Sequence, residues 1–405
     1  MKHALALSQN LDRLGTETAF AVSEEAARYA AGGREVYPFH LGDINVPTPA
    51  NIVEAANRAI RDGKTGYCPS AGIPALREAL AEDVGTRRGI SYQPDEVSIQ
   101  PGGKPVIGKF IAAIVNPGDE VLYPNPGYPI YESQIEYQGG KAVPYPYVKT
   151  DAGFDIDLGA IGQAVGPQTK ALIINNYQNP TGAECSAEEL QALAEIALEH
   201  DLWVLSDEAY FEIRYEGAAR SIASLPGMKE RTVILYTFSK KYAMTGWRLG
   251  AAIGPKPIID VFNKLNVNME SCSNHFIQWA MVEGLRGSQE GPIRILSILK
   301  ERRDAAVAGL NTIQGIQIAP PRTTFYLFPE VTEILKRKGL TDVEALRSGA
   351  LQETGVSFCT RVHFGRPMPG EESAFVRLAY SGIDRNRITA GLSRLKEYFE
   401  RALQT

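Results

Sequence analysis

The sequence predicts an α/β protein with a mostly parallel sheet in a large domain and a smaller α+β domain. Between residues 50 and 255, short apolar runs alternate with stretches of helical spacing, which is typical of a parallel sheet covered by helices on both faces. Three of the apolar runs are followed by the polar clusters NNYQNPTG, SDEAY and TFSK. Because ligands of open α/β sheets gather at the carboxyl ends of strands, we expect these clusters to converge on one site.

Four stretches of the large domain have the spacing and the end signals of helices. The first carries apolar side chains three and four positions apart. Pro74 opens the second and Gly89 closes it, while Pro105 opens the third, which ends in the turn NPGD. The fourth is amphipathic and follows the NPTG cluster. The predicted helices are 50–62, 74–89, 105–119 and 187–201.

Five short apolar runs in the same region predict strands. Each is bounded by proline, glycine or a polar cluster, and each is too short for a buried helix. The predicted strands are 120–126, 170–176, 202–210, 232–240 and 249–255.

From about residue 290 the pattern changes to a mixture of charged helices and isolated strands. Helices are predicted at 295–313, 342–353 and 387–402, and strands at 323–331, 356–359 and 375–381. We therefore divide the chain into a large domain at 46–290 and a small C-terminal domain at 291–405. The N-terminal segment 1–45 is expected to pack with the small domain.

Composition narrows the class of protein. With 405 residues, 44% hydrophobic and 22% charged, the chain has the composition of an ordinary soluble enzyme. A net charge of −5 provides no basic excess for nucleic acid. The four cysteines are far apart and read as reduced thiols, and neither a signal peptide nor an apolar run long enough to cross a membrane is present. We expect a cytoplasmic protein without metal.

Residues 101–110, PGGKPVIGKF, match the first part of a nucleotide-binding loop. Gly103, Gly108 and Lys109 satisfy G-x-x-x-x-G-K, but Phe110 stands where a Ser or Thr hydroxyl would bind magnesium. Glycines at the start of a helix nevertheless predict an anion close to the backbone, because the N–H groups and the helix dipole favour negative charge there.

The stretch YTFSKKYAMTGWRLG (236–250), with Asn-Pro-Thr-Gly and Asp-x-x-Tyr upstream, resembles the class I/II aminotransferases. These are fold type I enzymes that depend on pyridoxal 5′-phosphate (PLP). The resemblance extends from about residue 35 to 395 and is strongest to the bacterial aspartate aminotransferase branch. S-K-x-x-A-M-T-G-W-R is a highly specific motif. It implies a fold type I transferase in which residues 46–290 form the PLP-binding domain.

The resemblance implies a role for each residue around the cofactor ring. Lys240 would form the Schiff base with PLP and then move the α-proton of the substrate. Asp207 would keep the pyridine nitrogen protonated, so that the ring acts as an electron sink. Asn179 and Tyr210 would donate to the phenolate oxygen, and Tyr128 would stack on the ring. Lys240, Asp207 and Tyr210 are thus the catalytic candidates.

The same resemblance answers the question of the anion, which would be the PLP phosphate. Its predicted ligands are the backbone at Gly103 and Lys104, the hydroxyls of Thr237 and Ser239, and the guanidinium of Arg248. Tyr67 in KTGYCPSAG aligns with a tyrosine that reaches this phosphate from the other subunit. A shared site implies a homodimer.

For the substrate, the resemblance implies that Arg377 in FVRLAYS binds the α-carboxylate, with Asn179 and the backbone of Gly42 beside it. One aspartate-specific subgroup uses a partner-subunit arginine that the segment NMESCSNHFIQWA lacks. The other has a lysine directly after the paired glycines, and Lys104 occupies that place. The implied reaction moves an amino group from aspartate, or another acidic or polar donor, to a 2-oxo acid such as 2-oxoglutarate by a ping-pong mechanism.

Three departures from the family pattern leave the substrate open. Gln178 replaces an asparagine in NYQNPTG, and Arg322 and Thr323 replace a Gly-Ala pair. CTRVHFGRP, with Arg361 and His363, replaces P-G-x-x-F-G. These changes indicate either an unusual substrate or a different loop packing, and Arg361 is one candidate contact for the distal group of the substrate.

Two alternatives remain beside transamination. A carbon–sulfur lyase, a cyclase or an oxidase of the same fold would share Lys240, Asp207 and Arg377, so the motif does not separate them. A PLP-sensing domain of a transcription regulator is disfavoured, because the pattern begins by about residue 35 and the net charge is negative.

Overall fold

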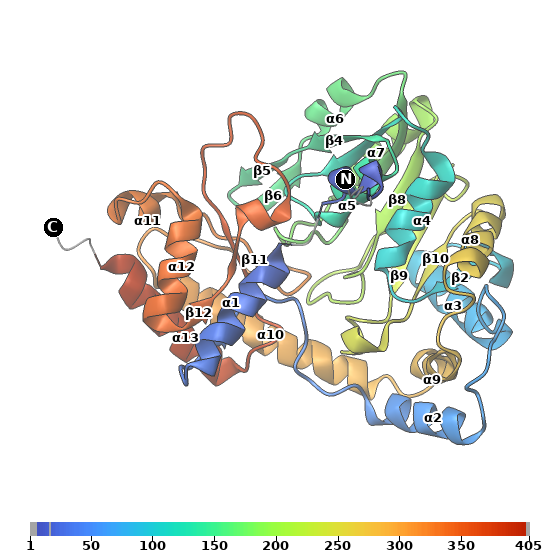
Figure 1. Ribbon diagram of the computed structural model, residues 1–405, viewed down its shortest axis with the longest axis horizontal. Coiled ribbons are helices and arrows are strands. Elements are labelled where there is room, and N and C mark those ends of the chain that lie inside the picture. Colours follow the sequence, from blue (N-terminus) through green and yellow to red (C-terminus); the bar gives the residue numbers. More distant parts are fainter. Residues whose placement is uncertain (1–5, 16–17, 402–405) are drawn as a thin grey trace, which may run out of the picture.

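A computed structural model describes residues 6–15 and 18–401. Its centre is a seven-stranded sheet in the order β2-β10-β9-β8-β7-β3-β4 (Figure 1). Strand β10 runs antiparallel to both of its neighbours, and the pairs from β9 to β4 are all parallel. The predicted mostly parallel sheet is therefore confirmed. In sheet order the strands are Val97–Gln100, Gly250–Ile253, Thr232–Thr237, Trp203–Asp207, Thr169–Ile174, Glu120–Pro124 and Lys141–Tyr145.

Helices cover both faces of this sheet because the strands are apolar on both sides. In β9, Val233 and Leu235 pack against one set of helices, and Ile234 and Tyr236 pack against the other. The first face is covered by α4 (Lys104–Ile114), α5 (Ile130–Tyr137) and α8 (Lys256–Met269). The second is covered by α2 (Ala50–Arg61), α3 (Pro74–Arg88), α6 (Leu158–Ala164), α7 (Ala187–Glu199) and α9 (His275–Arg286).

Two strands that lead into the predicted site end earlier than expected. The strand predicted at 232–240 stops at Thr237, and the strand predicted at 202–210 stops at Asp207. The Thr237 hydroxyl accepts the backbone N–H of Ser239 at 3.2 Å and so turns the chain out of the sheet. Lys240 therefore lies in a turn beyond the strand. Strand β2 was not predicted, since VSIQ is short and lacks a polar cluster behind it.

The C-terminal part is joined to the sheet by the long helix α10 (Glu290–Leu310), which runs between the two parts of the molecule (Figure 1). The C-terminal part also contains the helices α11 (Thr332–Arg337), α12 (Val343–Thr354) and α13 (Arg385–Glu400). Its small sheet has the order β11-β14-β13, formed by Tyr326–Leu327, Val376–Ala379 and Cys359–Thr360.

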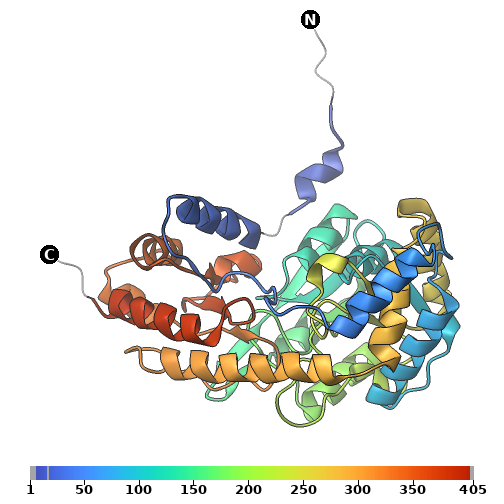
Figure 2. The ribbon, with the colours of Figure 1, turned by 90° about the horizontal axis from the view of Figure 1, so that it is seen from below.

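The described N-terminal residues pack with this C-terminal part. Strand β1 (Tyr37–Pro38) pairs in parallel with β12 (Val356–Ser357). Helix α1 (Ala19–Ala31) lies against the C-terminal helices (Figure 2), where Glu25 pairs with Arg347 of α12 at 2.8 Å. The division of the chain at residues 45 and 290 stays a prediction. Among the described helices, none is long and apolar enough to cross a membrane.

Candidate active site

A cavity of about 590 Å³ lies where the carboxyl ends of β7, β8 and β9 face the C-terminal part. All three polar clusters contribute to its wall, through Asn179, Asp207 and Lys240 among others. The expectation that they converge is therefore confirmed. Of the predicted site residues, twelve line this cavity: Gly42, Gly103, Lys104, Tyr128, Asn179, Asp207, Tyr210, Thr237, Ser239, Lys240, Arg248 and Arg377.

Lys240 reaches into the cavity from the turn after β9. Its Nζ atom donates to the backbone oxygen of Gly42 at 2.8 Å and lies 6.0 Å from the ring centre of Tyr210. Gly42 leaves room for the Tyr326 side chain, because a Cβ at residue 42 would lie 2.2 Å from the Tyr326 hydroxyl. The amine thus lies at the cavity wall, with the Gly42 backbone oxygen among its contacts.

Asp207 forms the floor of the cavity at the end of β8. Its carboxylate accepts the Tyr131 hydroxyl at 2.6 Å and the backbone N–H of Ala209 at 3.1 Å. Burial raises the pKa of this carboxyl to about 6, although the hydrogen bond from Tyr131 and the charge of Lys240 lower it. A buried carboxylate of this kind is stabilised by a cationic partner.

A second end of the cavity has the features of an anion site. Helix α4 begins at Lys104, directly after the glycine pair. Gly102 has φ +105°, and a Cβ there would lie 2.2 Å from Nη2 of Arg248, so a side chain at this position would displace the guanidinium. Thr237 and Ser239 lie across from the helix start, with their hydroxyls 2.9 Å apart. Backbone N–H groups, two hydroxyls and one guanidinium therefore face the same space.

This set of donors fits PLP. The buried Asp207 carboxylate suits a protonated pyridine nitrogen, and the helix start with Arg248 suits a phosphate. Lys240 stands beside the cavity that joins the two ends, as the bond to the cofactor aldehyde requires. Tyr128 is partly buried on the cavity wall, at 5.8 Å and nearly perpendicular to Tyr131.

The opposite wall carries Arg377, on β14. Its Nη1 donates to Oδ1 of Asn179 at 3.0 Å, its Nη2 donates to the backbone oxygen of His40, and its buried Nε has no hydrogen-bond partner among the described residues. The rings of Phe364 and Tyr326 each lie 4.6 Å from the guanidinium carbon. A guanidinium fixed in this way suits a carboxylate of the substrate.

Two predicted residues have exposed side chains, and one of them lies outside the cavity. Tyr67 does not line the cavity, and its side chain is 88% exposed. Lys104 lines the cavity and is exposed, with its Nζ 5.6 Å from the ring centre of Tyr128.

Each of the three departures from the family pattern includes a side chain that serves packing, and in the second the buried Thr323 hydroxyl donates to the backbone oxygen of Ile213 at 2.8 Å. Gln178 is fully buried and stabilises its own loop, donating to the backbone oxygen of Pro126 at 2.5 Å and accepting the N–H of Thr181 at 2.9 Å. Arg322 is exposed and does not line the cavity. Arg361 forms ion pairs with Glu371 away from the cavity, so the structure gives no support to a contact with the substrate.

Several residues of the cavity wall were missed by the sequence analysis. Tyr131 binds Asp207 directly, and the Tyr326 hydroxyl lies 2.7 Å from that of Tyr210. Asn175 accepts the backbone N–H of Asn179 at 3.0 Å and donates to the backbone oxygen of Asp207. Tyr131 could have been found, because it follows Tyr128 by three positions at the start of a helix and so lies on the same face.

Comparisons with known proteins agree with this geometry. Residues 35–395 match the family model described as "Aminotransferase class I and II". The chain is 34% identical to a probable aspartate/prephenate aminotransferase of Aquifex aeolicus, covering 97% of this chain and 98% of the relative. The structure of an aspartate aminotransferase from Thermus thermophilus with maleate has a TM-score of 0.89 at 31% identity. The match covers 98% of this chain and 100% of that chain. An alanine aminotransferase from Pyrococcus furiosus has a TM-score of 0.90 at 27% identity, with the same coverage. The chain therefore belongs to the class I and II aminotransferases, fold type I enzymes that use pyridoxal 5′-phosphate.

Proposed function

We propose that this aminotransferase takes the amino group of an L-amino acid with an acidic or polar side chain, aspartate first, and passes it to a 2-oxo acid such as 2-oxoglutarate. The observation that carries the proposal is the placement of Lys240, Asp207 and Arg377 around one cavity. An amine that transfers protons, a carboxylate that balances a ring cation and a guanidinium for a carboxylate match the needs of an amino acid reacting at its α-carbon.

In this proposal each residue has a defined task, and Asn179 serves both the substrate and the cofactor. PLP, when bound, withdraws electrons from the α-carbon of the substrate. Arg377 and Asn179 hold the α-carboxylate beside the Gly42 backbone, which leaves the α-proton within reach of Lys240 Nζ. Lys240 accepts that proton and later delivers it. Asp207 keeps a proton on the pyridine nitrogen, and Tyr210 and Asn179 donate to the phenolate oxygen.

The phosphate would be held by the start of α4 at Gly103 and Lys104, by the hydroxyls of Thr237 and Ser239, and by Arg248. Tyr128 would lie against the ring. In this arrangement the cofactor is bound by the sheet part of the chain, while the C-terminal part contributes Arg377.

We further propose a homodimer in which Tyr67 of each subunit reaches the phosphate of the other. Tyr67 is 88% exposed and lies outside the cavity of its own chain, which leaves its hydroxyl available to a second copy. A cytoplasmic location fits the thiols Cys68, Cys185 and Cys272, which form no disulfide.

The Tyr67→Phe variant tests the shared site. We expect wild type to sediment at twice the 44.2 kDa of one chain, and the variant to stay dimeric. Loss of one hydrogen bond to a charged phosphate should weaken PLP binding roughly ten- to a hundredfold. Equilibrium dialysis of PLP with both proteins measures this. An unchanged dissociation constant, or a monomeric wild type, would contradict the shared site.

The Lys104→Ala variant tests the substrate class. If the ammonium pairs with the distal carboxylate of the substrate, the variant should lose kcat/KM for aspartate and glutamate by roughly ten- to a hundredfold, the value of a hydrogen bond to a charged group. Alanine and phenylalanine should change little, because neither has a distal carboxylate. The phosphate contacts should remain, since they are made by the backbone at this position.

The measurement is kcat/KM for these four donors, with 2-oxoglutarate as the acceptor for aspartate, alanine and phenylalanine and oxaloacetate as the acceptor for glutamate, with PLP saturating and both products identified. An equal fall for all four donors would assign Lys104 to the cofactor or to structure. Release of ammonia without formation of a new amino acid would show elimination or oxidation in place of transfer.

A further inference from the structure

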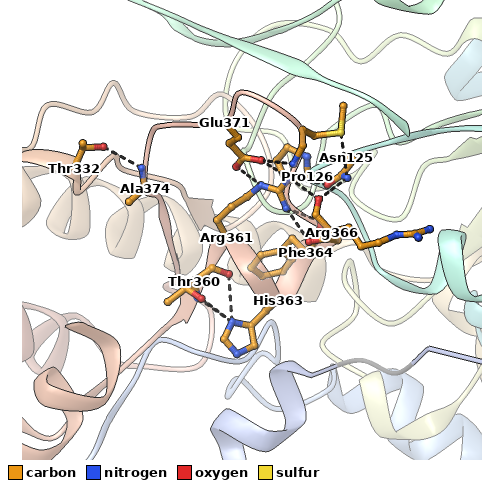
Figure 3. Close-up of polar contacts among 12 residues, drawn as sticks. Asn125, Pro126, Thr332, Thr360, Arg361, His363, Phe364, Arg366, Glu371 and Ala374 are labelled. Atoms are coloured by element: carbon orange, nitrogen blue, oxygen red, sulfur yellow. Dashed lines mark hydrogen bonds and ion pairs between the residues drawn. The ribbon is translucent and has the colours of Figure 1, made fainter. Parts of the chain in front are cut away.

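The short helix η5 (Arg361–Phe364) presents polar side chains on two opposite sides (Figure 3). Arg361 points to the contact between the C-terminal part and the segment around Asn125, whereas His363 points to the other side, toward α1. Both residues depart from the family pattern, and neither has a task in the proposed function.

Arg361 fixes η5 to the sheet part of the chain. Its guanidinium pairs with both oxygens of Glu371, at 2.6 and 2.9 Å, and donates to Oδ1 of Asn125 at 2.8 Å. The Asn125 side chain in turn donates to the backbone oxygen of Arg366 at 2.8 Å. The N–H of Gly127 donates to the backbone oxygen of Phe364 at 2.9 Å. These bonds hold η5 in one position relative to the cavity.

His363 is buried on the cavity wall, with 6% of its surface exposed. Its Nδ1 accepts the backbone N–H of Thr360 at 3.1 Å. Burial lowers the pKa of the imidazole, as do Arg347 and Arg377, while Glu344, 3.6 Å from Nδ1, raises it. We assign the proton of the neutral ring to Nε2, because Nδ1 uses its lone pair for the N–H of Thr360. Nε2 is on the edge of the ring that faces away from Thr360 (Figure 3).

The role of His363 can be inferred from the roles that the other parts of the cavity already have. One end of the cavity is the anion site, the floor is Asp207, and Arg377 is the carboxylate site. The Phe364 ring packs on Arg377, so the preceding residue of η5 lies beside the carboxylate site. The cavity lining that has no part in these three sites includes Ala19, Phe20, His363 and the side chain of Lys104. In this part of the lining, Lys104 offers a charged donor and His363 a neutral one.

We propose that His363 is a specificity-determining residue whose Nε2–H donates to an oxygen atom in the side chain of the amino donor, and that Arg361 positions it through η5. The inference rests on the proposed function. It extends the substrate class, because a neutral N–H binds an amide oxygen as well as a carboxylate oxygen, whereas an ammonium favours the carboxylate.

The test compares three amino donors of similar size: aspartate, asparagine and 2-aminobutyrate, which has no side-chain oxygen. In His363→Phe, which keeps a ring and removes the N–H, we expect kcat/KM to fall roughly three- to thirtyfold for aspartate and asparagine alike, relative to 2-aminobutyrate. His363→Gln retains an N–H donor and should keep most of this preference. Arg361 does not contact the substrate in this proposal but positions His363, so Arg361→Met should reduce the preference in the same direction. Lys104→Ala, in contrast, should affect aspartate more than asparagine.

Binding provides a readout that does not need turnover. The PLP-loaded wild type and variants are titrated calorimetrically with succinate, succinamate and butyrate, which correspond to the three donors without their amino groups. Loss of preference for the first two compounds in His363→Phe supports the inference even if no transamination is found, in which case the proposed function alone fails. An unchanged preference, or an equal loss for all three compounds, overturns it and assigns His363 to structure or to the α-carboxylate.

Discussion

The Lys240→Ala variant is expected to fold, to bind PLP without a covalent bond, and to lose at least roughly 10²–10⁴-fold in kcat, the contribution of a positioned proton-transfer group. The reason is that Lys240 Nζ, which lies 2.8 Å from the Gly42 oxygen, is an amine at the wall of the cavity. Lys240→Arg should be equally inactive, because it retains the charge and the reach but is no proton acceptor at neutral pH. The measurements are turnover of aspartate with 2-oxoglutarate and the mass of the borohydride-treated protein, which should carry the cofactor in wild type alone.

The control has to be chosen from the structure. Lys241 is attractive from the sequence, since side chains at successive positions point apart. It is buried, however, with 7% of its surface exposed, and its Nζ has no hydrogen-bond partner among the described residues. Its truncation would change the free energy of unfolding. Lys264 on α8 is exposed and lines no described cavity, so Lys264→Ala should be fully active. An active Lys240→Ala, or covalent cofactor on another lysine, would refute the assignment.

The Asp207→Asn variant is expected to lose roughly 30- to 5,000-fold in kcat/KM, which corresponds to about 2–5 kcal/mol for truncating one partner of a buried charge pair. The amide keeps the size of the side chain and can still meet the Tyr131 hydroxyl, but it cannot balance a proton on the pyridine nitrogen. PLP should still bind through the phosphate contacts. Activity near that of wild type would mean that another group protonates the ring.

The free energy of unfolding of the apoprotein provides a second test of Asp207→Asn that does not depend on turnover. Burial raises the pKa of Asp207 from 3.8 to about 6, so the folded protein favours the neutral carboxyl more than the unfolded chain does. The charged carboxylate therefore lowers the free energy of unfolding above pH 6, and this penalty disappears as the pH falls toward 4. Asp207→Asn should accordingly be at least as stable as wild type at pH 8, with the difference shrinking between pH 6 and 4. Urea unfolding at several pH values measures it, and a less stable variant at pH 8 would contradict this account.

The sequence was sufficient for five of the seven strands of the central sheet, all but β2 and β4, and for the residues that chemistry dictates. Lys240, Asp207 and Asn179 follow strand ends, and parallel topology brings strand ends together. Their convergence could therefore be predicted without coordinates. An anion close to the glycine pair before α4 could also be predicted, because a backbone that approaches an anion closely tolerates no side chain.

Other residues could not be predicted because their role depends on tertiary packing. Whether Lys241 is exposed depends on which helices cover the turn after β9, and no local pattern encodes this. The hydrogen bond from Arg361 to Asn125 joins residues that are more than 200 positions apart. Helix α1 brings Ala19 and Phe20 to the cavity although it precedes the recognised motifs, and its apolar positions carry no sign of a binding wall.

The distribution of the cavity residues along the chain has a consequence for biosynthesis. The start of α4, Asp207, Lys240 and Arg248 are all translated before α10, whereas Arg377 lies on β14, close to the end of the chain. Strand β14 pairs with β11 and β13 and follows both in the chain, so this small sheet is incomplete until β14 has emerged from the ribosome. The groups proposed to bind the phosphate are thus synthesised well before the arginine proposed to bind the α-carboxylate. A nascent chain that has completed the seven-stranded sheet contains the elements proposed to retain the cofactor while it still lacks the arginine proposed to bind the α-carboxylate of the substrate.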